Sequence, residues 1–323
     1  MVQLSEADQQ IMALKLTGPI KINSVFIVYM IGMGCGVMSE EPLSKLNKQI
    51  IYINSDKLLV NRNNPIYDID RKNNVTYVPD FRNNKIIIIG EDGLVIKTIS
   101  THGPHGIEID DKESIYVASY LDNRIKKFNK NGIEVIGWDG NLQSLVNIDS
   151  PVSIDTDNNR NVYIASNNLI IKVSEDGQFI KKFDLSKVNS DKVLPHGITF
   201  HANKIYVAER KTKKLLIYNS EGEYLNDFTT NGGSGFDPLS INFYNNEFIL
   251  VPNYANSSLH VFDMDGQELK IVGGKGEGYG KWLSLTNVTE DRMGNIHTVE
   301  EDTNRIQIIN FKENLFRLQT HKN

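Results

Sequence analysis

Cysteine is almost absent from this chain, since Cys35 is the only one among 323 residues. One cysteine cannot form an internal disulfide framework, and the sequence after Cys35 has no thiol nucleophile and no paired-cysteine metal knuckle. A glycine-rich phosphate loop ending in Lys-Ser/Thr and a Gly-x-Ser-x-Gly elbow are missing as well. The sequence therefore lacks the common signatures of nucleotide binding and of serine or cysteine hydrolysis.

Clusters of basic residues are also missing. The net charge is -5, and lysine and arginine are scattered along the chain. A protein that binds a phosphate backbone concentrates positive charge on one face, so we expect no nucleic-acid partner, RNA included. Asparagine, isoleucine, tyrosine and glycine are frequent instead, which is typical of many short strands joined by polar turns. The composition favours an all-β protein.

An apolar run follows Lys21 and reads INSVFIVYMIGMGCGVM, residues 22–38. Its length matches the apolar region of a signal peptide and is short for a membrane span. We predict that residues 1–38 form a signal or anchor segment; a buried core helix is the alternative. The protein would then be extracytoplasmic, either secreted or held at a membrane.

The end of this run resembles the lipobox of bacterial lipoproteins, in which a cysteine is lipidated and becomes the first residue. Cys35 follows Gly34, while Gly32 stands where the motif usually has an apolar residue. A start at Met12 would give the run an ordinary basic leading region. The resemblance implies lipidation of Cys35 and attachment to a membrane.

Six similar units follow, spaced by about 40 to 45 residues, the range expected of propeller blades. They span residues 64–99, 103–138, 150–183, 194–228, 237–272 and 282–318. Each alternates apolar and polar residues with period two, as strands with one buried face require, and divides into four strands. Before the last strand, five units carry a turn pair that favours a tight hairpin: Asp92-Gly93, Asn131-Gly132, Asp176-Gly177, Glu221-Gly222 and Asp265-Gly266.

Four-stranded units repeated around an axis form a β-propeller, so we predict a six-bladed β-propeller over residues 39–323. Residues 49–62 read as a further hairpin of the same kind. Pairing of this hairpin with the last blade would close the ring and leave no open sheet edges. We expect a single domain and a monomer.

The second unit carries the blade pattern most fully, with Pro104, Gly106, Tyr116-Val117-Ala118 and Asn123-Arg124-Ile125. In this respect the chain resembles NHL-repeat propellers over roughly residues 60 to 320. The glycine-rich loop before the last unit, GGKGEGYGKWLSL, is similar to the loop between NHL blades, with Trp282 in place of a Phe. The resemblance implies the fold and leaves the function open, because this fold serves scaffolds, RNA binders and enzymes.

The residue after the leading Pro of each unit is aimed at the propeller axis, and we call this position the axial slot. The slots hold Pro65 or Ile66, His105, Val152, His196, Leu239 and Thr286. Two imidazoles from alternate blades can converge on zinc or another divalent metal, or can exchange protons. Alternatively, each histidine packs at the axis and donates a hydrogen bond to a carbonyl of the neighbouring blade.

The two Pro-His-Gly segments and the stretch VAERKTKKLLIY also resemble peptidyl-α-hydroxyglycine α-amidating lyase, a six-bladed enzyme whose axial zinc is held by three histidines. His105 and His196 match two of these ligands, and Arg210 matches an arginine near that active site. Thr286 falls at the third ligand position, and Asn167 and Asn168 fall where the catalytic tyrosine is expected. The resemblance thus implies an incomplete catalytic set.

The second strand of each unit ends at one mouth of the propeller, and its exit residues are predicted to form a ligand rim. They are Phe81, Tyr120, Asn167, Arg210, Tyr254 and Glu301. Aromatic and charged groups around a funnel suit a small polar ligand, although ordinary exposed loop residues are the alternative. Asp80, Glu209 and Glu300 precede this rim, and we expect them to bond backbone N–H groups of the adjoining turn.

Two functions remain open from the sequence. The first is an exported binding or scaffold propeller for a protein, peptide or glycan ligand at the propeller face. The second is a metal-dependent lyase or hydrolase, with His105 and His196 as metal ligands and with Arg210 or Tyr120 as catalytic residues that support the substrate.

Overall fold

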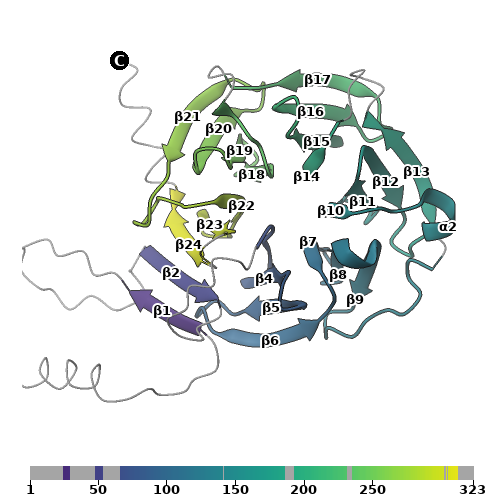
Figure 1. Cartoon of the computed structure of the whole chain (residues 1–323), viewed down its shortest axis with the longest axis horizontal. Helices are drawn as coiled ribbons and strands as arrows, with labels where there is room; N and C mark the ends of the chain where they lie inside the picture. The colour runs from purple at the N-terminus through teal and green to yellow at the C-terminus, as the bar shows by residue number, and fades with distance from the viewer. Residues whose placement is uncertain are drawn as a thin grey trace, which may run out of the picture.

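The protein is described by a computed structural model that covers residues 25–29, 48–53, 66–140, 142–185, 193–230, 235–301, 303 and 305–311. Its strands form six antiparallel sheets arranged in a ring (Figure 1). The prediction of an all-β, six-bladed β-propeller is confirmed. Each of the six sequence units supplies the inner strands of one blade.

In blades 1 to 5 the first strand lies nearest the axis, and successive strands pair outward in chain order. Blade 1 consists of β3 (Asp70–Lys72), β4 (Val75–Asp80), β5 (Lys85–Ile89) and β6 (Val95–Ser100), blade 2 of β7 (Pro104–Ile109), β8 (Ile115–Ser119) and β9 (Arg124–Phe128), and blade 3 of β10 (Pro151–Thr156), β11 (Val162–Ser166), β12 (Leu169–Val173) and β13 (Phe179–Asp184). Blade 4 consists of β14 (Pro195–His201), β15 (Lys204–Glu209), β16 (Lys214–Asn219) and β17 (Tyr224–Phe228), and blade 5 of β18 (Asn242–Tyr244), β19 (Phe248–Asn253), β20 (Ser258–Asp263) and β21 (Glu268–Gly273).

Blade 6 combines the two ends of the described chain. β22 (Leu285–Glu290), β23 (Asn295–Glu300) and β24 (Arg305–Asn310) pair in order, and β2 (Lys48–Ile53) lies antiparallel to β24. β1 (Val25–Tyr29) pairs with β2 as a fifth strand. Strand β2 is the described part of the hairpin that we expected at 49–62, and the remainder lies outside the described residues.

The predicted signal or anchor segment, residues 1–38, lies outside the described residues except for β1, and Cys35 is among those that are not described. No helix in the described ranges is long and apolar enough to cross a membrane.

Blade 2 departs from the expected four strands. After the turn at Gly132 the chain makes one isolated bridge, between Phe128 and Glu134, and then crosses to blade 3. Trp138 packs on Tyr116 with ring centroids 5.5 Å apart and donates its indole N–H to the carbonyl of Glu175 at 2.7 Å. The crossing chain thus fastens blade 2 to blade 3 in place of an outer strand.

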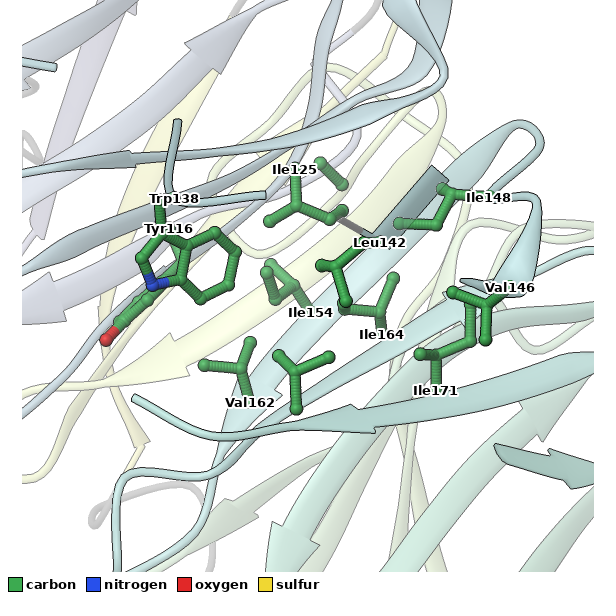
Figure 2. Close-up of a cluster of buried hydrophobic side chains, with 12 residues drawn as sticks. Tyr116, Ile125, Trp138, Leu142, Val146, Ile148, Ile154, Val162, Ile164 and Ile171 are labelled. Atoms are coloured by element: carbon green, nitrogen blue, oxygen red, sulfur yellow. The ribbon is translucent and has the colours of Figure 1, made fainter. Parts of the chain in front are cut away.

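A short helix follows this crossing and fills the space between blades 2 and 3. Helix α2 (Leu142–Val146) buries Leu142 and Val146 beside Ile148. Figure 2 shows these side chains packed against aliphatic residues of β10, β11 and β12, among them Ile154, Ile164 and Ile171. Sequence periodicity did not predict this helix, because its five residues are too few to show a helical period.

The inner strands of adjacent blades approach closely at the two Pro-His-Gly segments. A Cβ atom on Gly106 would lie 2.8 Å from the carbonyl oxygen of Val152, and one on Gly197 would lie 2.6 Å from Cα of Ser240. Both glycines therefore permit a contact between neighbouring inner strands that any larger residue would prevent. This contact places the preceding histidine against the backbone of the next blade.

Candidate functional site

The two axial histidines are held by backbone carbonyls of the next blade. Nδ1 of His105 lies 2.7 Å from the carbonyl oxygen of Val152, and Nδ1 of His196 lies 2.9 Å from that of Leu239. A carbonyl oxygen only accepts, so Nδ1 carries the proton in both rings and Nε2 keeps a free lone pair. The hydrogen bond to the neighbouring blade that the structural alternative predicts is thus present at both histidines, and it leaves each Nε2 able to accept a proton.

Thr286, in the third polar slot, also donates a hydrogen bond to a carbonyl of the next blade. Its hydroxyl lies 2.8 Å from the carbonyl oxygen of Ile66. Polar and apolar slots therefore alternate around the axis. The polar residues His105, His196 and Thr286 each bond the carbonyl of the apolar slot residue in the next blade. Inner strands of adjacent blades share no ladder, so their buried carbonyls need such side-chain donors.

Five rings from blades 1, 2 and 4 meet at the axis, and we call them the axial ring cluster: Tyr67, Phe81, His105, Tyr120 and His196. Tyr67 stacks on His105 with centroids 4.2 Å apart and an interplanar angle of 11°. The two imidazole centroids are 5.5 Å apart. Phe81 and Tyr120 meet His105 at 6.2 and 5.6 Å. His105 is thus the hub of the cluster.

Charged groups flank the cluster. Arg210 donates Nε–H and Nη2–H to the two carboxylate oxygens of Asp237, at 2.8 and 2.6 Å. Its guanidinium lies 5.6 Å from the ring centroid of Tyr254. The Glu301 carboxylate lies beside Tyr67, as its effect on that phenol shows. A bidentate pair of this kind fixes the guanidinium more firmly than a single contact would.

Burial sets the protonation of the cluster. Burial, and then the neighbouring His196, lowers the pKa of His105 to about 3, while burial and then the charge of Arg210 lower the pKa of His196 to about 4. Burial and then Glu301 raise the pKa of Tyr67 to about 12. Both imidazoles are therefore neutral near pH 7, and the phenol is protonated.

Five of the six predicted rim residues lie in or beside the axial ring cluster. Phe81 and Tyr120 belong to the axial ring cluster, and Arg210, Tyr254 and Glu301 flank it. Asn167 lies apart from these contacts, because it is exposed and donates its amide to the carboxylate of Asp149 at 2.8 Å.

Sequence reasoning missed Tyr67 and Asp237. Tyr67 lies one residue beyond the slot that we assigned to Pro65 or Ile66, and that assignment was uncertain because the first unit lacks a Pro-His-Gly segment. Asp237 directly precedes the leading Pro238. A charged residue before a leading Pro is the signal that could have identified it.

The set of donors at the axis does not match a three-ligand zinc site. His105 and His196 offer two Nε2 atoms, but Thr286, in the third slot, is engaged with the backbone. Within the described ranges, no group of three or more His, Cys, Asp or Glu side chains is arranged to hold a metal ion. A catalytic zinc normally has three protein ligands, so the axial side chains alone would not complete such a site.

Asp80, Glu209 and Glu300 bond backbone N–H groups, as expected. The Glu209 carboxylate accepts from the N–H of Leu194 at 2.8 Å, and Glu300 accepts from Leu283 at 2.8 Å. Asp80 accepts from Asn83 at 3.3 Å. These carboxylates fasten loops next to the rim and are occupied by that role.

Four carboxyl groups line the inner strands below the cluster: Asp68, Asp70, Glu108 and Asp155. Asp68 accepts the N–H of Ile107 at 2.7 Å, and Asp155 accepts that of Phe200 at 2.6 Å, so they also link neighbouring blades. Burial raises the pKa of all four, of Asp68 and Asp155 to about 7 and of Asp70 to about 6.

The fold and the axial site define the chain as a six-bladed β-propeller with a histidine and aromatic centre. Comparison of the sequence with protein-family models and with curated proteins finds no match. Similar solved structures exist. One is a streptogramin B lyase, with TM-score 0.57 and 13% identity, where the match covers 81% of this chain and 86% of that one.

Another is a catalytically inactive histidine-to-alanine variant of virginiamycin B lyase from Staphylococcus aureus with quinupristin, with TM-score 0.56 and 17% identity, covering 81% of this chain and 87% of that one. A protein of unknown function from Bacteroides caccae has TM-score 0.52 and 16% identity, covering 67% and 79%. At such identities the likeness shows the fold alone.

Proposed function

We propose that this chain is an NHL-type propeller that binds a small peptide or a glycan fragment at the axial ring cluster. The observation that carries the proposal is the convergence of Tyr67, Phe81, His105, Tyr120 and His196 at one axial point. Rings offer stacking faces to apolar or sugar groups of a ligand, while fixed polar groups set its orientation.

The flanking charges suit a ligand with both donors and acceptors. Arg210 presents donors beyond its two bonds to Asp237, and Glu301 presents acceptors beside Tyr67. Peptide groups and sugar hydroxyls carry both kinds of partner. An anionic ligand would meet the like charge of Glu301, and a cationic ligand would meet that of Arg210.

The test is a screen of short peptides and oligosaccharides by ligand-observed NMR against the full chain. Phe81→Ala and Tyr120→Ala are expected to abolish any binding that is found. Tyr224→Ala is the matched control, because Tyr224 lies in the outer strand of blade 4 and is partly exposed. Binding that survives both cluster variants would place the ligand elsewhere and refute the proposal.

A second candidate function is a lyase, favoured by the tautomer of the two histidines. A neutral imidazole with a free Nε2 can remove a proton from carbon while a leaving group departs from the next atom, and the proton can then pass to that leaving group. The solved structures that are similar in fold include lyases, and for one of them a histidine-to-alanine variant is inactive.

This candidate predicts that His105→Ala and His196→Ala abolish turnover of a substrate found in a screen of cyclic and modified peptides. Elemental analysis of the full chain tests whether zinc or another divalent metal contributes. Stoichiometric metal that is lost in a His105→Ala, His196→Ala variant would support a metal-dependent enzyme. Turnover unaffected by both variants would refute the axial base.

We further propose that the chain is exported and tethered to a membrane through a lipid on Cys35. Removal of the residues before Cys35 would take away β1 and leave blade 6 with the four strands β2, β24, β23 and β22. The support is the apolar run with Gly34-Cys35 near its end. Radiolabelled palmitate is expected to be incorporated into the wild type in a bacterial host and not into Cys35→Ala. Equal labelling of the two, or none in either, would remove lipidation from the proposal.

A further inference from the structure

The Arg210–Asp237 ion pair depends on a short segment that leads into blade 5. Asp237 lies between Phe236 and Pro238, and its backbone is held at both ends. Its N–H donates to Oδ1 of Asn253 at 2.9 Å, and its carbonyl accepts from Tyr254 N–H at 2.9 Å. The position of the Asp237 carboxylate, and with it the guanidinium of Arg210, therefore follows the position of Asn253.

Asn253 is fully buried, at 1% exposure, and its amide orientation is fixed by its partners. Its oxygen accepts from the N–H of Asp237 and of Ala255, and its nitrogen donates to the carbonyl of Gly235 at 3.0 Å. One amide hydrogen remains, and Nε2 of His260 lies 3.1 Å from that nitrogen. His260 thus supplies the acceptor that this hydrogen requires.

The tautomer of His260 follows from this arrangement. Because Nε2 accepts from Asn253, Nδ1 carries the proton and donates to the carboxylate of Glu268. His260 is 3% exposed, and its ring packs against Phe236 with centroids 5.2 Å apart. The imidazole therefore links the outer strand of blade 5 to the segment that carries Asp237.

Blades 4 and 6 fasten the equivalent segments without a histidine. There the carboxylates of Glu209 and Glu300 accept backbone N–H groups directly. An amide in this position has a donor end as well as an acceptor end, so it needs a second, oriented partner. Blade 5 meets that need with a buried imidazole. The segment that leads into blade 5 carries Asp237, which binds Arg210.

We propose that His260 is a positioning residue for the axial site, which acts on Arg210 through Asn253 and Asp237. The inference rests on the proposed function only in that Arg210 belongs to the ligand site. His260 itself touches neither the axial ring cluster nor a ligand placed there, since its contacts are with Asn253, Glu268 and the rings of Phe236 and Phe262.

The test reads Arg210 directly and needs no ligand. In full-chain protein labelled with ¹⁵N-arginine, Arg210→Lys assigns the Nε–H signal, and its hydrogen-exchange rate reports the bond to Asp237. His260→Leu is expected to raise this rate roughly 2- to 30-fold, the range for coupling between residues in contact through a network. His260→Gln is expected to restore it, because its amide oxygen can accept from Asn253 while its nitrogen donates to Glu268.

His297→Leu is the matched control. His297 is equally buried, at 3% exposure, and it is held between Asp291 of blade 6 and Arg71 of blade 1. This variant is expected to lose stability and leave the Arg210 exchange rate unchanged. An unchanged rate in folded His260→Leu, or an equal rise in His297→Leu, would overturn the proposal.

Glu268→Leu serves if His260→Leu does not fold, because it removes the acceptor that fixes the tautomer of His260 and leaves Asn253 in place. An Arg210 exchange rate in this variant equal to that of the wild type would also overturn the proposal. A measured change in exchange together with failure of every ligand screen would leave His260 as a positioning residue and refute only the proposed function.

Discussion

The phenol of Tyr67 and the imidazole of His105 lie face to face, with centroids 4.2 Å apart and planes 11° from parallel. One ring comes from the segment before blade 1 and the other from the start of β7, so the stack spans the boundary between two blades. The imidazole of His105 also contacts that of His196. The stack therefore couples the stability of the propeller to the geometry of the proposed site.

Replacement of Tyr67 tests this coupling. Tyr67→Ala removes the stack and part of the packing at the axis, so it is expected to lower the free energy of unfolding by about 2 kcal/mol. Tyr67→Phe keeps the ring and is expected to cost less than about 1 kcal/mol, because only the hydroxyl beside Glu301 is lost. Urea unfolding followed by fluorescence measures both. Equal losses in the two variants would show that the hydroxyl, and not the stack, stabilises this point.

The hydrogen bond from His105 to Val152 makes a separate prediction. His105→Phe keeps a ring of similar size and leaves a buried carbonyl without its donor, which is expected to cost about 1–3 kcal/mol. His105→Asn retains an N–H group at the position of Nδ1 and is expected to recover part of this loss. Thermal unfolding by circular dichroism compares them, and an asparagine variant no better than phenylalanine would contradict the role of the donor.

The glycines after the axial histidines provide a steric test. Gly106→Ala and Gly197→Ala would each press a methyl group into the backbone of the next blade, so each is expected to destabilise the protein by about 1–3 kcal/mol. Gly278→Ala is the control, because no atom lies within 4 Å of the Cβ position there. Comparable midpoints of urea unfolding for all three variants would refute the close approach of the inner strands.

Protonation of Asp68 makes stability depend on pH. Burial raises the pKa of this carboxyl from 3.8 to about 7, so the folded protein binds more protons than the unfolded chain between these values. Its contribution to stability therefore falls as pH rises from about 4 to 7. The axial histidines act in the opposite direction, because their lowered pKa values make the folded protein less stable as pH falls below about 6.5.

The contribution of Asp68 is isolated by difference. The free energy of unfolding of the wild type minus that of Asp68→Asn is expected to fall between pH 4 and pH 7. Asp111→Asn is the control, since the side chain of Asp111 is 63% exposed, and its difference is expected to stay flat. A flat difference for Asp68→Asn would mean that the carboxyl titrates near its ordinary value in the folded protein.

The architecture could be predicted from the sequence because each blade corresponds to one copy of a sequence repeat. Glycine turns such as Asp92-Gly93 and Asp176-Gly177, together with strict alternation between them, specify hairpins locally and recur at a constant spacing. The crossing after blade 2 could not be predicted in this way. Its driving force is the burial of Trp138 and Leu142 against another blade, which is a tertiary contact without a period.

The candidate site was predictable in part for the same reason. His105, His196 and Arg210 occupy repeat positions whose direction the fold dictates, and the structure brings them close to one axial point. Tyr67 and Asp237 act at positions that the repeat leaves variable, before an inner strand begins. The role of Thr286 was also hidden, because a hydroxyl that bonds a carbonyl cannot be told from one that lines a channel until the partner is known.

The closure of blade 6 by β2 and β24 has a consequence for the order of synthesis. Strands β1 and β2 leave the ribosome before the other strands of this blade, and β24, the partner of β2, follows only after the five other blades have been made. At roughly 5–20 residues per second, β2 waits on the order of ten to fifty seconds with an open edge. Blade 6 is therefore the last blade to be completed. Until β24 is made, the unpaired edge of β2 is the part of the chain that a chaperone would need to shield.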